Sequence, residues 1–378
     1  MINLRKHRFT FLVAGMAVVI VAVLPLFFSA SCRSLQQGAA EMKARESLRS
    51  MTRGGVLPSE DAVARIESDF PRTTAGALAR IVRARIKTNA RDFTGAAALL
   101  NASSIRDYTQ IPEYALFLRA AALDQAGSRG DARAAYEQLA LDYPTSLRAR
   151  EALLRAAQMM IEDAQAAGVS PLLRELAAKD DAAALLLTAK AYEQLSDTTR
   201  ALSAYRRIYF FAPANTESTE AASDIKRLGS TTAPATAEEA GTRAEKLFQA
   251  KHYGEAFDAY ADSSTRFPAG LTPELQLHRG IAAANAKRTA DAITALTGVP
   301  SSAGELRAEA LYNLALAYAR ARQWPQARTA AEDLRHSFPN SGWTPRAFVQ
   351  LGQIADDAKN TVDSAYFYRA AVNFFPGT

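Results

Sequence analysis

Two residue types that build covalent or metal-bound sites are scarce in this chain. The only cysteine is Cys32, which excludes an intrachain disulfide and a cluster of thiolate metal ligands. The histidines His7, His252, His278 and His336 are scattered, and no two of them have metal-ligand spacing. We therefore expect no metal, and we expect the three later histidines to be exposed.

Catalytic and cofactor-binding motifs are also missing. The sequence contains no GxxxxGK[ST], no GxGxxG after a strand, no HExxH and no GxSxG. Paired acids occur at Asp180-Asp181, Glu238-Glu239, Glu332-Asp333 and Asp356-Asp357, where helix capping or solvation explains them better than acid/base catalysis. The chain as it stands is thus expected to be no enzyme and to need no cofactor.

Helix-breaking residues are few. Among 378 residues there are 19 glycines and 15 prolines, while alanine is very common and hydrophobic residues make up 48%. Because alanine has the best intrinsic helix propensity, this composition favours a helical protein with ample material for a core. The sequence predicts an all-α fold.

The net charge of +6 is concentrated at one end. Residues 1–53 hold eight Lys or Arg and two Glu, so they carry the whole excess and the remainder is neutral. A nucleic-acid-binding protein would carry its basic excess on the folded domain. We therefore expect no nucleic-acid partner.

The first residues have the character of an export signal or an anchor. A basic stretch, residues 1–8, precedes an apolar segment from Phe9 to Ala30, which is longer than a usual signal core and close to the length that spans a bilayer. We interpret residues 1–31 as a signal peptide or membrane anchor and predict a flexible tether over residues 32–56. Arg and Lys flank both sides, so the orientation stays open.

Small residues lead up to the cysteine in "SASC", Ser29 to Cys32. This stretch resembles a bacterial lipoprotein signal, which implies that Cys32 is lipidated, although Ser29 stands where an aliphatic residue is usual. The alternatives are a signal peptide cut at small residues and an uncut anchor. All three predict an exported, periplasmic or membrane-anchored protein.

A pattern of alanine, an aromatic four residues later and proline eight residues after that recurs along the chain. Its full sets are Ala132/Tyr136/Pro144, Ala201/Tyr205/Pro213 and Ala256/Tyr260/Pro268; Ala327/Ala331/Pro339 and Ser364/Tyr368/Pro376 each carry one change, and Tyr192 and Tyr318 precede two of the alanines. This spacing resembles the tetratricopeptide repeat of about 34 residues. The resemblance implies a packing role for all these residues, with helical hairpins stacked into a solenoid.

The repeats predict about eight or nine helical hairpins over residues 57–378, with weak signals at 75–112, 148–180 and 217–229. The stretch "GSTTAPAT", Gly229 to Thr236, is rich in turn-forming residues. We therefore predict a first array over 57–229, a linker over 230–236 and a second array over 237–378. Trp324 and Trp343 lie near turns, where they either contact a partner or pack on the next hairpin.

Longer phrases resemble the helical superstructure that precedes the catalytic domain of bacterial soluble lytic transglycosylases. They are "AYRRIYFFAPANTESTEAASDIKRL", "TRAEKLFQAKHYGEAFDAYADSSTRFP" and "AEALYNLALAYARARQWPQARTAAEDLRHSFPNSGWTPRAFVQLG". The resemblance implies a role at peptidoglycan. The Glu-Ser pairs Glu46-Ser47 and Glu217-Ser218 lack the downstream catalytic motif, so no catalytic residue is carried over.

These features lead to one main hypothesis and one alternative. The main hypothesis is a non-catalytic tetratricopeptide scaffold of the cell envelope, which holds a protein partner or a peptidoglycan strand and forms the superhelical part of a lytic-transglycosylase-like protein. The alternative is an outer-membrane lipoprotein of the assembly-factor type. A groove that clamps a peptide carboxylate needs clustered Lys or Arg with Asn, and the sequence alone identifies no such cluster.

Overall fold

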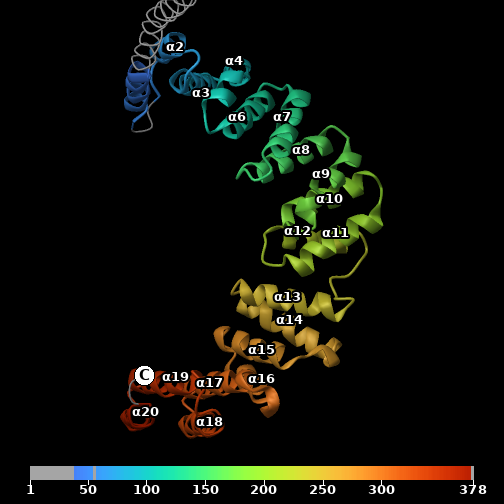
Figure 1. Ribbon diagram of the computed structural model, residues 1–378. Helices are drawn as coiled ribbons and strands as arrows, with labels where there is room; N and C mark the ends of the chain where they lie inside the picture. The colour runs from blue at the N-terminus through green and yellow to red at the C-terminus, as the bar shows by residue number, and fades with distance from the viewer. Residues whose placement is uncertain (1–37, 54–56, 376–378) are drawn as a thin grey trace, which may run out of the picture. The chain divides into compact units, whose positions relative to one another are not determined.

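The computed structural model describes residues 38–53 and 57–375, and within these ranges every regular element is a helix and no strand occurs (Figure 1). The predicted all-α solenoid is therefore confirmed. The predicted signal or anchor over residues 1–31, Cys32 and Pro376 lie outside the described residues. None of the helices among the described residues is long and apolar enough to cross a membrane.

The chain divides into two compact units, one up to Glu162 and one from Asp163. The first unit contains a helix over residues 38–51. It continues with α2 (Glu60–Asp69), α3 (Thr74–Asn89), α4 (Phe93–Leu100), α5 (Ser103–Tyr108), α6 (Pro112–Gln125), α7 (Arg129–Asp142) and α8 (Ala149–Glu162). Helices α3, α4, α5 and α8 fall in segments where the repeat signal is weak. Each helix packs mainly on its neighbours in sequence, α6 on α7 and α7 on α8 for example.

The second unit begins with the 3-10 turn η2 (Ala166–Gly168) and continues as helical hairpins. Its helices are α9 (Val169–Ala177), α10 (Ala182–Gln194), α11 (Thr198–Phe211), α12 (Glu217–Arg227), α13 (Ala237–Gln249), α14 (Tyr253–Arg266), α15 (Pro273–Asn285), α16 (Thr289–Thr297), α17 (Glu305–Arg320), α18 (Trp324–Ser337), α19 (Trp343–Asp357) and α20 (Thr361–Phe374). The 3-10 turns η3 (Pro268–Gly270) and η4 (Ser301–Ala303) join hairpins.

The first helices of the last four hairpins form a continuous layer. Helix α13 packs on α15, α15 on α17 and α17 on α19, while each also packs on its own second helix. In such stacks each repeat contacts only its neighbours, and the small rotation between repeats leaves an extended surface along one side. Side chains on α13, α15, α17 and α19 can therefore line one shared surface.

The turns inside the hairpins share one backbone design. Lys287, with φ of 62°, follows α15 in the left-handed region, and Arg288 donates its backbone N–H to the Ala283 carbonyl at 2.9 Å. This bond closes the end of the first helix before the second begins, as in a Schellman motif. The same arrangement recurs at Lys251 and Lys359, so the tight turns are built without glycine at these positions.

Part of the segment predicted to be a flexible tether is helical. Residues 38–51 form a helix whose Ala44 and Leu48 are buried against Val63 and Ile66 of α2, in a cluster that also includes residues of α3. The Ala75 N–H donates to the Glu41 carboxylate at 3.3 Å. The physical reason is that this polar stretch still places two apolar residues four apart, which is enough to cover the end of α2 and α3.

The predicted linker, residues 230–236, is not helical and joins α12 to α13. Arg206 of α11 holds it, donating to the Thr231 carbonyl at 2.9 Å and the Ala233 carbonyl at 3.2 Å and pairing with Glu239 at 2.6 Å. Helix α11 also packs on α13 across it. The division into two arrays at this loop stays a prediction; the compact units divide after Glu162.

Candidate functional site

The structure places most of the predicted packing residues inside the hairpins. Buried positions include Ala132, Ala201, Ala256, Ala327, Tyr136, Tyr205, Tyr260 and Pro213, whereas Tyr192 and Tyr318 are half-buried. Pro144, Pro268 and Pro339 are exposed just beyond the ends of second helices. Proline fits there because a helix that is ending no longer needs the missing N–H.

Tyr368 lies differently from the other aromatic positions. It is 38% exposed, and its neighbour Phe367 is the fully buried ring of α20. One edge of Tyr368 nevertheless covers Gly352 of α19, where an added Cβ would lie 2.7 Å from the ring. The position thus contacts the first helix of its own hairpin while its other side faces solvent.

A row of polar and aromatic side chains crosses the first helices of the second unit. We call it the first-helix row and define it as Glu245 (α13), His278 (α15), Glu309 and Tyr312 (α17), and Gln350 (α19). Its members come from the helices that pack side by side in the layer described above. The row therefore spans four consecutive hairpins.

The N-terminal part of the row is a hydrogen-bonded acid–imidazole pair. His278 Nδ1 lies 2.8 Å from Glu245 Oε1, and the Tyr260 hydroxyl donates to the same carboxylate. The imidazole also stacks on Phe248, with ring centroids 4.5 Å apart. His278 was predicted to be exposed, but its side chain is only 22% exposed because α13 and α14 supply these partners.

The pair and its neighbour Glu309 have shifted pKa values. The hydrogen bond to Glu245 raises the pKa of His278 against the opposing effect of burial, and the charges of Glu245, Glu274 and Glu309 add to the rise. Burial alone would raise the pKa of Glu245, but the bonds from His278 and Tyr260 hold it below its usual value. Burial raises the pKa of Glu309. The row therefore carries a protonatable site in the middle of its length.

The C-terminal part of the row is aromatic. The Tyr312 hydroxyl donates to Gln350 Oε1 at 2.8 Å, and its ring centroid lies 5.0 Å from that of Trp343. The Arg346 guanidinium lies 5.5 Å from the Trp343 ring centroid. Trp343 therefore packs on the preceding hairpin while one face meets a cation. Trp324, at the start of α18, is half-buried against the same core.

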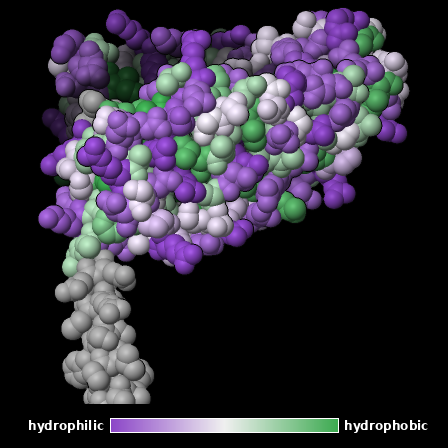
Figure 2. Space-filling view, turned by 90° about the horizontal axis from the view of Figure 1, so that it is seen from above, coloured by the Kyte–Doolittle hydropathy of each residue, from purple (hydrophilic) through white to green (hydrophobic). Residues whose placement is uncertain are grey.

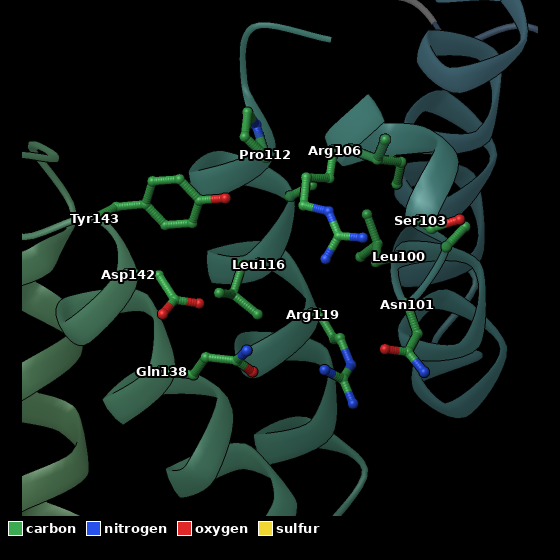
Figure 3. Close-up of a pocket in the computed structure, with 13 residues that line it drawn as sticks. Leu100, Asn101, Ser103, Arg106, Pro112, Leu116, Arg119, Gln138, Asp142 and Tyr143 are labelled. Atoms are coloured by element: carbon green, nitrogen blue, oxygen red, sulfur yellow. The ribbon is translucent and has the colours of Figure 1, made fainter. Parts of the chain in front are cut away.

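A second candidate lies in the first unit, in a cleft of about 220 Å³ between α4, α5, α6 and α7 (Figure 3). Arg106 and Arg119 point into it from α5 and α6, and Asn101 lies beside them. Gln138 and Asp142 face them from α7. No ion pair joins Arg119 to any carboxylate among the described residues.

This cleft gathers the kind of residues that a carboxylate-binding groove needs, although they were not recognised from the sequence. Two guanidinium groups and an amide can donate several hydrogen bonds to an acidic group, and Asp142 can accept one from a neighbouring N–H. The sequence signal was weak because Asn101, Arg106 and Arg119 come from three elements, of which α4 and α5 lie where the repeat pattern fades.

Among the described residues, nothing points to a metal-binding site beside these two candidates. Figure 2 shows a face on which hydrophobic residues are dispersed among hydrophilic ones. Within the described ranges, no group of three His, Cys, Asp or Glu side chains could hold a metal ion. Both candidates offer side chains that donate and accept hydrogen bonds.

Comparison with known proteins identifies the repeat. The family model for the tetratricopeptide repeat matches residues 114–146, 183–209 and 309–341. Three segments of the chain are thus similar to the tetratricopeptide repeat. The matched segments cover α6 with α7, most of α10 with α11, and α17 with α18, so the sequence pattern and the packed hairpins agree.

Solved structures similar to the chain include proteins with tetratricopeptide repeats. A structure of Pseudomonas aeruginosa pilF is 18% identical, covering 66% of this chain and 95% of that one, with a TM-score of 0.28. The TPR2AB domain of yeast Sti1 in complex with pHSP90 is 18% identical, covering 75% and 98%, with a TM-score of 0.27. A tetratricopeptide repeat protein from Parabacteroides merdae is 12% identical, covering 80% and 94%, with a TM-score of 0.27. No curated protein sequence matches the chain.

Proposed function

We propose that the chain is a non-catalytic scaffold of a bacterial cell envelope that holds a protein segment along the first-helix row. The N-terminal segment attaches it to a membrane. Tetratricopeptide repeats, a basic apolar N-terminus and a neutral folded part together support this role. A solenoid suits it because successive repeats offer similar positions to an extended ligand.

The observation that carries the proposal is the composition of the row. Glu245, His278, Tyr312 and Gln350 present an acid, an imidazole, a phenol ring and an amide from four stacked first helices. These groups recognise main-chain amides and polar side chains by hydrogen bonding, and Tyr312 with Trp343 offers an aromatic platform. An extended polypeptide satisfies such a row better than a small ligand does.

A finer form of the proposal makes this chain the superhelical part of a lytic-transglycosylase-like protein. The three phrases quoted above and the order of export signal, repeats, broken linker and further repeats support it. The ligand of the row is then a peptidoglycan strand or a protein of the cell wall machinery. The alternative, an outer-membrane lipoprotein of the assembly-factor type, is favoured by Cys32 after small residues.

Site-specific photo-crosslinking tests the proposal. A photoreactive phenylalanine analogue replaces Tyr312 in the full chain, and a matched variant carries it at Thr329, an exposed residue of the second helix α18. After irradiation in intact envelopes, we expect polypeptide adducts at position 312 and not at 329. Adducts that a muramidase releases from position 312 would favour the glycan ligand, whereas equal adducts at both positions would contradict a binding row.

A separate measurement tests the proposal that the chain is not catalytic. The purified chain is incubated with peptidoglycan, and the soluble products are separated by chromatography. We expect no anhydro-muropeptides, because no acid of the folded part follows the catalytic pattern of the transglycosylases. Release of these products by the chain alone would overturn this part of the proposal.

A further inference from the structure

A cleft in the first unit is lined by residues of the helix over residues 38–51 and of α3. Its volume is about 600 Å³, within the range typical of ligand pockets. Its floor and rim are formed by Leu48, Leu78, Ile81, Val82, Arg45 and Arg49. An apolar floor beside cationic groups fits an amphipathic ligand, because the floor can contact its hydrocarbon part and the arginines can pair with its anionic part.

The arginines of this cleft have no internal task. Arg45 and Arg49 are exposed, and among the described residues neither guanidinium group has a hydrogen-bond or ion-pair partner. They lie four residues apart on one helix face, where like charges destabilise a helix. Arg53 lies just beyond this helix and lines an adjoining recess together with Arg49. Glu46 lines both the cleft and the recess and carries one negative charge against these three positive ones. The free positive charge is available to an anion.

The position of the helix in the chain identifies where the anion comes from. About 12 residues separate Ala30, the end of the apolar segment, from Met42, a span of at most about 40 Å. If the apolar segment lies in a bilayer, Arg45 and Arg49 remain near the surface of that bilayer. Met42 is 69% exposed on the same helix and lines the cleft, as an apolar residue at a membrane interface does.

We propose that this cleft binds an anionic phospholipid of the membrane to which the N-terminus is attached. The lipid phosphate lies between the Arg45 and Arg49 guanidinium groups, and part of an acyl chain covers Leu48, Leu78 and Val82. The inference rests on the membrane attachment proposed above. A nucleic acid fits less well, because the cleft lacks an aromatic side chain on which a base could stack.

The test measures hydrogen exchange of residues 41–53 and 74–85 in the full chain. The chain is placed in lipid nanodiscs of neutral phosphatidylcholine or with added anionic phosphatidylglycerol. A variant with Arg45→Gln and Arg49→Gln is compared with a matched variant with Arg65→Gln and Arg72→Gln, which removes two exposed arginines of the same unit outside the cleft. The detergent-solubilised chain is also titrated with short-chain phosphatidylglycerol and, separately, with inorganic phosphate.

We expect slower exchange in anionic discs only, lost in high salt and in the Arg45/Arg49 variant but kept in the matched variant. Affinity for short-chain phosphatidylglycerol should fall about 30-fold in the Arg45/Arg49 variant, at about 1 kcal/mol per arginine. Equal exchange in both disc types, or an equal loss in both variants, would overturn the proposal. Protection by inorganic phosphate equal to that by the lipid would also overturn it. A chain that enters no disc yet binds short-chain lipid through Arg45 and Arg49 would refute the attachment alone.

Discussion

At the scale of single residues, His278 combines several interactions. It lies in the first-helix row, pairs with Glu245 at 2.8 Å and stacks on Phe248. The charges that face it are those of Glu245, Glu274 and Glu309. Because all three are acidic, the protonated ring is favoured in the folded protein, and the row changes charge with pH at this residue.

His278→Gln should make stability less dependent on pH. The folded-state pKa of His278 is raised above the unfolded value, so its stabilising effect is fully present below about pH 6.5 and is lost as pH rises through the folded-state pKa. The free energy lost by the substitution should be larger near pH 5.5 than near pH 8.5 by about 1 kcal/mol, as for a partly screened hydrogen bond to a charged group.

Urea denaturation at the two pH values measures this difference. The exposed His252, whose Nδ1 lies 3.3 Å from Glu255, provides the matched control as His252→Gln. A difference that is the same for both histidines, or that is larger at high pH, would contradict the assigned role of His278.

At the scale of elements, small residues determine how closely the two helices of a hairpin approach. Gly280 of α15 faces Leu296 of α16, and an added Cβ would lie 2.6 Å from the Leu296 side chain and 3.2 Å from its backbone nitrogen. Gly352 and Tyr368 repeat this arrangement in the last hairpin. Buried alanines such as Ala120, Ala189 and Ala315 occupy the corresponding place in other hairpins.

Gly280→Ala should therefore destabilise the protein by about 1–3 kcal/mol, the usual cost of overpacking. The same substitution at Gly241 of α13, where an added Cβ would meet nothing within 4 Å, should stabilise it by about 0.5–1 kcal/mol through helix propensity. Thermal denaturation of both variants measures whether each substitution destabilises or stabilises the protein. Stabilisation by both substitutions would show that close approach at Gly280 does not limit the hairpin.

At the scale of the whole molecule, stability should be local. Helices pack on their neighbours in sequence and on the next repeat, and the chain divides into two compact units. In such an array the total stability is a sum over repeats and their nearest-neighbour interfaces. A substitution in one unit should therefore leave protection in the other unit largely unchanged.

Leu334→Ala provides the test in the second unit. Leu334 is completely buried in α18, and removing its side chain should cost about 2–5 kcal/mol. Hydrogen exchange should accelerate in α17 to α20 but not in α2 to α7. Leu100→Ala in α4 is the reciprocal variant and should affect the first unit alone. Acceleration along the whole chain in either variant would contradict local stability.

The sequence by itself determined the helical class, the hairpin repeat and the residues inside it. An alanine, an aromatic and a proline at fixed spacing reflect contacts within one hairpin, and such contacts are close in sequence. For the same reason Ala201, Tyr205 and Pro213 could be assigned before their burial was known.

Only the tertiary structure decided which side chains meet across repeats and across elements. The Glu245–His278 pair joins residues 33 apart, and the cleft of Arg45 and Arg49 requires a helix that the polar segment 38–51 forms only by packing on α2 and α3. Such contacts depend on how helices stack, and neither propensity nor the spacing within one hairpin specifies that stacking. The candidate binding surfaces therefore came from the structure, while the repeat that supports them came from the sequence.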